Sequence, residues 1–124
     1  MKATSTLCAI ILSFQISMVA HAKTPAKYGD KVKVKMETSH GDIELELNNK
    51  KAPVSVENFL SYVKEGFYNG TIFHRVMNGF MIQGGGFTKT LERKNTHSTI
   101  HNEADNGLTN EVGTIAMART SAIH

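Results

Sequence analysis

The sequence of 124 residues has one cysteine, two prolines and little excess charge. A single cysteine excludes a small fold held together by internal disulfides. Two prolines and ten glycines are too few for a collagen-like chain, and a hydrophobic content of 40% excludes a disordered one. A formal net charge of +3 is too small for the dense basic surface of a nucleic-acid-binding domain. The composition therefore predicts one globular domain with no nucleic acid among its partners.

The first 22 residues have the layout of a secretory signal peptide. A positive start at Lys2 precedes an apolar run from 7 to 20, which contains the only cysteine, Cys8. Residues 20–22 (Ala-His-Ala) then place small side chains on both sides of one arbitrary residue, as at a cleavage site. The run is shorter than the ~20 apolar residues that span a bilayer, which disfavours a membrane anchor. We expect cleavage after Ala22 and no membrane association of the mature chain.

Two alternating stretches follow a polar leader at residues 23–30. Residues 31–38 and 43–47 place apolar side chains on one side and charged side chains on the other, as half-buried strands do. The intervening residues 39–42 (Ser-His-Gly-Asp) predict a turn. We expect the two strands to form an antiparallel hairpin.

A helix is predicted after Pro53. The hydroxyl of Ser55 is expected to cap a free backbone N–H in the first turn, and Gly66 suits the left-handed residue after the helix end. An apolar stripe at helical spacing would pack on the core and consists of Val56, Phe59, Leu60 and Val63.

The remaining segments are rich in β-formers and turns. Strands are predicted at 71–77 and 80–83, joined by a turn at Asn78-Gly79. The three glycines at 84–86 would let two backbones approach each other. A long polar loop at 88–110 precedes a last, mostly apolar strand at 112–118.

One segment, residues 68–85, carries the chemistry. Its sequence is YNGTIFHRVMNGFMIQGG. The guanidinium of Arg75 lies in the middle of the first predicted strand. Two large apolar side chains, Phe80 and Met81, follow the turn, and the amide of Gln83 comes two residues after them. No serine, cysteine or carboxylate that could act as a nucleophile lies in this segment. The segment therefore predicts a site that combines a cation, an apolar surface and a neutral hydrogen-bonding group. Such a site suits a reaction of an uncharged group that forms no covalent bond to the protein.

Residues 68–85 closely resemble the signature of the cyclophilins, the peptidyl-prolyl cis-trans isomerases. The resemblance extends to the hairpin at 32–47, to the helix at 52–66 and to residues 102–119, which include Asn-Glu-Ala-Asp and Ala-Met-Ala-Arg. It implies a mostly β fold with some helix, a cyclophilin-like antiparallel β-barrel. Family members continue beyond the position of His124 with strands that close the barrel, so we expect residues 31–124 to form its N-terminal part, incomplete at the C-terminal side.

The resemblance also implies the activity and the site. Rotation about an X–Pro bond has a barrier of ~18–20 kcal/mol, and it localises the lone pair on the prolyl nitrogen. A donor that binds the twisted nitrogen better than the planar one lowers this barrier. In the family an arginine that matches Arg75 is this catalytic donor. The matching substrate-binding residues are Phe80 and Met81 for the proline ring, Gln83 for the substrate backbone, and Ala118 for the residue before proline.

Further expectations follow from the same resemblance. The partners would be proline-containing unfolded or extended polypeptides and cyclosporin-type ligands, with no cofactor and no metal. The Asn-Glu-Ala-Asp segment and the signal peptide resemble the periplasmic branch of bacterial members, which implies a periplasmic location. Arg119 departs from the family, because many relatives carry asparagine at its position.

Two other functions compete with catalysis. The chain could be a non-catalytic peptide-binding or holdase fragment, which an isomerisation assay would distinguish. It could also bind a metal through His97 and His101, four residues apart, with Glu103 nearby, although the surrounding residues predict a loop. His74 could be a general base, but a structural role is favoured because no proton needs to move.

Overall fold

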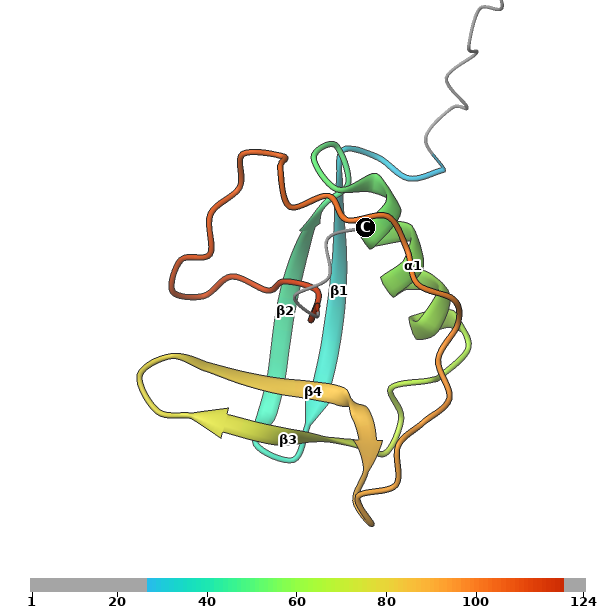
Figure 1. The fold of residues 1–124 in the computed structure, drawn as a ribbon, viewed down its shortest axis with the longest axis vertical. Helices are drawn as coiled ribbons and strands as arrows, with labels where there is room; N and C mark the ends of the chain where they lie inside the picture. Colours follow the sequence, from blue (N-terminus) through green and yellow to red (C-terminus); the bar gives the residue numbers. More distant parts are fainter. Residues whose placement is uncertain (1–26, 120–124) are drawn as a thin grey trace, which may run out of the picture.

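The computed structural model describes residues 27–119 (Figure 1). The expected signal peptide, its cleavage site after Ala22, most of the polar leader and residues 120–124 lie outside the described residues. The elements follow in the order β1, β2, α1, β3 and β4. In the described part of the chain, no helix has the length and apolar content needed to cross a membrane.

The first hairpin consists of β1 (Lys31–Thr38) and β2 (Gly41–Asn48). Its strands pair antiparallel from Lys31 opposite Asn48 to Thr38 opposite Gly41, which confirms the predicted hairpin. The lysines of β1 lie on the exposed face, where Lys31 pairs with Glu46 and Lys35 with Asp42. The alternation of the sequence thus places one apolar face toward the core and one charged face toward solvent.

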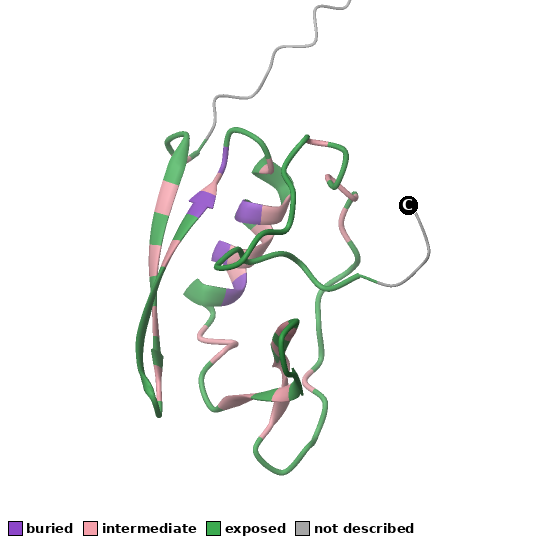
Figure 2. Cartoon of the chain, turned by 90° about the vertical axis from the view of Figure 1, so that its left-hand side faces the viewer, coloured by how far each residue is buried: buried purple, intermediate pink, exposed green. Residues whose placement is uncertain are grey.

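Helix α1 (Pro53–Lys64) packs across the end of β2 and completes a small core. Leu47, Val56 and Leu60 are buried together, and partly buried apolar side chains surround them. Tyr62 is also buried, whereas Val63 of the predicted stripe is 37% exposed. Figure 2 shows the buried residues on α1, at the adjoining end of β2 and, with Asn49, in the connection between them.

The two ends of α1 are capped differently from each other. Gly66 adopts a φ of +66°, as predicted. Its N–H donates to the carbonyl of Val63, and the N–H of Phe67 donates to the carbonyl of Tyr62, so two carbonyls of the last turn are satisfied. The expectation for Ser55 is wrong. The residue that precedes the helix is Ala52, which provides no side-chain cap, and Ser55 already lies within the first turn.

A second hairpin consists of β3 (Thr71–Met77) and β4 (Met81–Thr88). Strand β3 has the predicted bounds, but β4 is longer than the predicted 80–83, because the three glycines continue the strand. The two hairpins form separate two-stranded sheets. The antiparallel, mostly β architecture with one helix is therefore observed, and residues 27–119 form no closed barrel.

The predicted strand at 112–118 is wrong. These residues form a turn followed by coil, and all of them are exposed. The N–H of Thr114 donates to the carbonyl of Glu111, and Gly113 has a φ of +86°. Apolar composition alone cannot make a strand, since its backbone N–H and C=O groups need a neighbouring strand, and none pairs with this segment among the described residues.

Aromatic side chains connect the end of α1 to the start of β3. The ring centroid of Tyr62 lies 4.6 Å from that of Phe67 and 6.0 Å from that of Tyr68. The ring centroids of Tyr68 and Phe59 are 5.2 Å apart. Desolvation by burial, with a smaller effect of Tyr62, raises the pKa of Tyr68 to about 12. This cluster anchors the first residues of the second hairpin to the helix.

Candidate functional site

The predicted site residues come together mainly on one face of the second hairpin. Arg75 on β3 lies directly opposite Gln83 on β4, and Met77 lies opposite Met81. Residues paired in this way point to the same face of an antiparallel ladder, with Cβ atoms about 5 Å apart. The guanidinium, the amide and two thioether side chains therefore share one surface, as the substrate-binding prediction requires.

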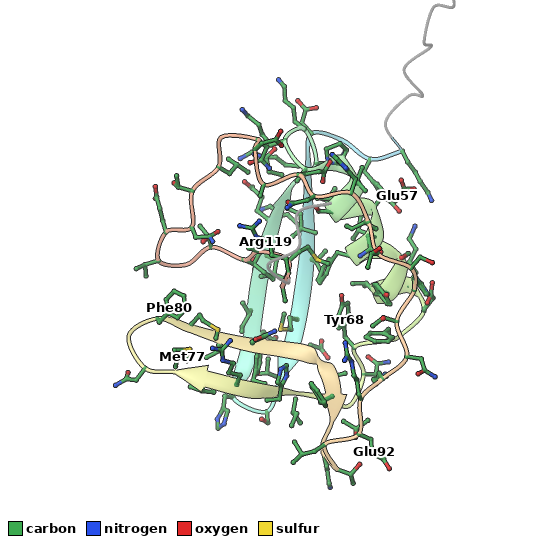
Figure 3. The ribbon with its side chains drawn as sticks, viewed as in Figure 1. Glu57, Tyr68, Met77, Phe80, Glu92 and Arg119 are labelled. Carbon is green, nitrogen blue, oxygen red and sulfur yellow. The ribbon has the colours of Figure 1, made fainter. Side chains whose placement is uncertain are left out.

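Phe80 extends this surface at the tip of the hairpin. It belongs to the turn that joins the strands, in which its N–H donates to the carbonyl of Met77 at 3.1 Å. Its side chain is 77% exposed, and Figure 3 shows Phe80 and Met77 at the same end of the hairpin. An exposed phenyl ring beside methionines offers an apolar surface on which a proline ring could be buried.

Arg75 is free to bind a ligand. Its side chain is exposed, and among residues 27–119 no ion pair engages its guanidinium. The guanidinium remains charged at every accessible pH and presents five N–H donors in a planar fork. The site thus holds a permanent donor next to Gln83, which is only half-buried and can both donate and accept.

Two glycines of β4 allow the close packing that supports the hairpin. A Cβ atom on Gly84 would lie 2.7 Å from Cδ1 of Phe73 and 3.0 Å from the carbonyl oxygen of Ile72. A Cβ atom on Gly85, whose φ is +88°, would lie 2.9 Å from Cε1 of Tyr68. The prediction that the three glycines let two backbones approach is confirmed only for Gly84, because Gly85 meets a side chain and a Cβ atom on Gly86 would meet nothing within 4 Å. The glycines also accompany the irregular register between Phe73 and Arg75.

His74 precedes Arg75 on β3, at the position where the pairing of the two strands is irregular, and its surroundings differ from those of Arg75. Its ring is 4.5 Å from the ring of Phe87, and its Nδ1 atom is buried without a hydrogen-bond partner. The His74 ring is therefore packed within the hairpin, whereas the Arg75 side chain is exposed. This placement favours the structural interpretation over the general base.

Ala118 is not part of the hairpin surface. It lies in the exposed coil that precedes the end of the described residues. The ladder of β3 and β4 therefore brings together Arg75, Met81 and Gln83, and its turn adds Phe80. The contact of Ala118 with substrate remains a prediction.

The histidine of the metal-binding alternative has other partners. The Nε2 atom of His97 lies 3.0 Å from Oε2 of Glu65, and its ring stacks on Tyr62 with centroids 4.4 Å apart. Its backbone N–H donates to the hydroxyl of Tyr62 at 2.7 Å. Within residues 27–119, no group of three or more potential metal ligands of the His, Cys, Asp or Glu type lies together. The His97 ring is instead a contact between the long loop and α1.

Glu103 has a structural role that the sequence reasoning missed. Its Oε1 atom accepts a hydrogen bond from the N–H of Val54 at 3.1 Å, and its Oε2 atom accepts from the N–H of Ser55 at 2.8 Å. Glu103 therefore supplies the cap at the start of α1 from 48 residues further along the chain. A sequence signal existed: Ala52, the residue immediately before Pro53, has no side-chain acceptor, so the free N–H groups of the first turn needed an acceptor from elsewhere.

Comparisons with known proteins show which family the chain resembles. Residues 33–124 match the family described as "Cyclophilin type peptidyl-prolyl cis-trans isomerase/CLD". Peptidyl-prolyl cis-trans isomerase A of Dickeya dadantii is 62% identical over 88 residues, which cover 71% of this chain and 46% of that protein. Peptidyl-prolyl cis-trans isomerase B of Escherichia coli is 59% identical over 91 residues, which cover 73% of this chain and 56% of that protein.

The chain spans about half the length of the curated relatives it matches. The family match nevertheless includes both hairpins and α1, together with all five predicted site residues. The chain belongs to the cyclophilin-type peptidyl-prolyl cis-trans isomerase family.

Proposed function

We propose that this chain acts in the cis-trans isomerisation of X–Pro bonds in unfolded or extended polypeptides. The observation that carries the proposal is the pairing of Arg75 with Gln83 on a surface that ends in Met77, Met81 and Phe80. That surface combines a donor for the prolyl nitrogen with an amide for the peptide backbone and an apolar area for the proline ring.

The mechanism follows from what changes during rotation. In the planar amide the prolyl nitrogen shares its lone pair with the carbonyl, so it is a poor acceptor. As the bond twists, the lone pair returns to the nitrogen, which can then accept a hydrogen bond from the Arg75 guanidinium. Gln83 holds the neighbouring backbone, and burial of the proline ring on Met81 and Phe80 keeps the nitrogen aligned. Because the donor interacts more strongly with the twisted state, the barrier falls.

The direct test is an isomerisation assay on an X–Pro peptide with the chain from residue 23 onward. Turnover above the uncatalysed rate that disappears in Arg75→Ala would support the proposal. The matched control is Arg93→Ala, which removes an exposed arginine of the following segment that lies outside the site. Equal rates for the wild type and Arg75→Ala would refute catalysis by this surface.

Peptide binding without catalysis is the second candidate. It is favoured by the openness of the site, since Arg75 and Phe80 are both exposed to water. Water raises the local dielectric and weakens the preference of a guanidinium for one state of the ligand. Binding of a proline-containing peptide to the wild type, lost on Phe80→Ala and accompanied by no acceleration, would establish this alternative.

Ligand class and location complete the proposal. A cyclosporin-type ligand would occupy the same apolar surface and would compete with the peptide for Phe80 and Met81. Residues 1–22 direct secretion to the periplasm, with cleavage after Ala22. A reporter fused behind residues 1–22 should be exported and should begin at Lys23. An intact Met1 on the exported reporter would refute cleavage.

A further inference from the structure

Three Asn-Gly sequences occur in turns of this chain, at 69–70, 78–79 and 106–107. In such a pair the backbone nitrogen of glycine can reach the side-chain carbonyl carbon of the preceding asparagine, because glycine has no Cβ to obstruct it. Whether it does so depends on how freely the asparagine side chain and the turn can move. The three turns differ in this respect.

The turn at Asn106 is held on several sides. The side-chain oxygen of Asn106 accepts a hydrogen bond from the N–H of Leu108 at 2.9 Å, and its backbone carbonyl accepts from Nζ of Lys51 at 3.2 Å. Its own N–H donates to the carbonyl of Glu103. The hydrogen bond from Leu108 holds the Asn106 side chain in one orientation, and the two backbone contacts restrain its turn.

The turn at Asn69 is also restrained. The N–H of Asn69 donates to the carbonyl of Gly66. Both the N–H and the hydroxyl of Thr71 donate to the carbonyl of Tyr68, at 3.1 and 2.7 Å. Tyr68 belongs to the aromatic cluster beside α1. The turn at Asn69 therefore moves only if the packing at the end of the helix opens.

Asn78 is the least restrained of the three asparagines. Asn78 and Asn69 are both exposed, and in the part of the chain that the structure describes neither side chain makes a hydrogen bond, so the two sites differ in how their turns are held. One hydrogen bond, from the N–H of Phe80 to the carbonyl of Met77, closes its turn. The backbones of β3 and β4 adjoin no other strand or helix of residues 27–119, and the close contact of Gly85 with Tyr68 lies away from this tip. Free hairpin tips open at little cost in free energy, so the backbone of this turn can reach the geometry for attack.

We infer that Asn78 is a site of spontaneous deamidation. The Gly79 nitrogen attacks the side-chain carbonyl carbon of Asn78, a new C–N bond forms, and the bond to the side-chain amide nitrogen breaks. That nitrogen leaves as ammonia and takes up the proton that the Gly79 nitrogen loses. Water then opens the cyclic imide at one of its two carbonyls, giving either aspartate or an isoaspartyl linkage, and no oxidant or other reactant is needed.

The product changes the hairpin that carries Arg75. Either product places a negative charge at the tip, where residues 68–85 otherwise contain no carboxylate. The isoaspartyl product also adds a methylene group to the backbone between Met77 and Met81, which lengthens the turn and disturbs their pairing. Deamidation of Asn78 would therefore alter the surface on which Arg75 lies. This consequence holds whether or not that surface catalyses isomerisation.

The experiment compares the three asparagines in one sample of the chain from residue 23 onward. After incubation in mildly alkaline buffer, trypsin separates them into peptides 65–75, 76–89 and 95–119. Each deamidation adds about 1 Da to its peptide, and fragment spectra locate it. We expect Asn78 to convert several-fold faster than Asn69 and Asn106. In concentrated urea the three rates should become similar, because the folded turns no longer differ.

Two results would overturn the inference. The first is that Asn69 or Asn106 converts as fast as Asn78 in native buffer. The second is that the order of rates in native buffer persists unchanged in urea, which would mean that local sequence and not the fold sets the rates. In Asn78→Ser, conversion in peptide 76–89 should disappear while the other two peptides convert as before. Persistence of the mass increase in that peptide would place the reaction at a residue other than Asn78.

Discussion

The carboxylate of Glu103 holds Ser55 at two points. Its Oε2 atom accepts hydrogen bonds from both the backbone N–H and the hydroxyl of Ser55, each at 2.8 Å. The negative charge also lies at the N-terminal end of α1, where the helix dipole favours an anion. One side chain thus joins the long loop to the helix that covers the core.

Removal of this cap should destabilise the fold. We expect Glu103→Ala to lower the free energy of unfolding by about 1–3 kcal/mol, because two backbone N–H groups lose a charged acceptor. Glu103→Gln should cost less, since its amide oxygen can still accept. Urea unfolding measures both. Glu57→Gln is the matched control, because its exposed pair with Lys27, at 3.6 Å, should contribute at most about 1 kcal/mol. An equal loss in Glu57→Gln would contradict the special role of Glu103.

Replacement of Arg75 tests the catalytic role. We expect Arg75→Ala to reduce kcat/KM for an X–Pro peptide by about 10²–10³, the effect of losing one preorganised donor to the transition state. Arg75→Lys should not restore activity, because an ammonium lacks the planar fork of the guanidinium. His74→Gln should have a much smaller effect, since the His74 ring packs on Phe87 and the reaction moves no proton. A larger loss in His74→Gln than in Arg75→Ala would show that the two roles are reversed.

Alkaline pH should weaken the fold through Tyr68. Burial raises the pKa of Tyr68 from its ordinary value of 10.0 to about 12. Between these values the unfolded chain has released the Tyr68 proton while the folded chain retains it, so stability falls as pH rises. The contribution of Tyr68 is fully present below pH 10.0 and is lost toward about pH 12. The slope is at most about 1.4 kcal/mol per pH unit, and because Tyr68 is only half-buried, solvent screening reduces it.

The measurement for Tyr68 is unfolding by urea at several alkaline pH values, with Tyr68→Phe as the reference. The wild type should lose more stability over this range than Tyr68→Phe, which has no proton to release at this position. An absorbance titration of the phenolate should show one tyrosine that ionises late in the folded chain and normally in urea. Identical pH profiles for the two proteins would contradict the assignment.

The apolar side chains on the second hairpin should matter for association and not for stability. Val76 and Ile82 are cross-strand partners, and they are 68% and 54% exposed. We expect Val76→Thr and Ile82→Thr to change the free energy of unfolding by about 0.5 kcal/mol or less and to reduce self-association, because they shrink an exposed apolar patch. Light scattering and urea unfolding measure the two effects.

The buried counterpart is Leu60 in the core of α1. Leu60→Ala should cost about 2–5 kcal/mol, since it removes buried methyl groups and leaves a cavity. A loss of stability in Ile82→Thr as large as that in Leu60→Ala would mean that the face of the hairpin carrying Ile82 is packed in solution.

Local sequence patterns predict the elements that are stabilised by contacts between residues close in the sequence. The hairpin at 31–48 follows from alternation and a nearby turn, and α1 follows from Pro53, an apolar stripe and Gly66. The opposition of Arg75 and Gln83 has the same origin, because a short turn at Asn78-Gly79 determines which residues of its two strands meet. The family signature then identifies which of these side chains belong to a site.

Contacts between residues far apart in the sequence determine the features that local patterns do not predict. The cap of α1 comes from Glu103, which no pattern around Ser55 reveals, and the ring of His97 lies against Tyr62, a distance of 35 residues along the chain. Residues 112–118 have the composition of a strand and yet form coil, because a strand exists only where another strand satisfies its backbone groups. The sequence by itself determined the two hairpins and the helix, since the interactions that form them are between residues close in the sequence. Only the tertiary structure decided which distant side chains complete them.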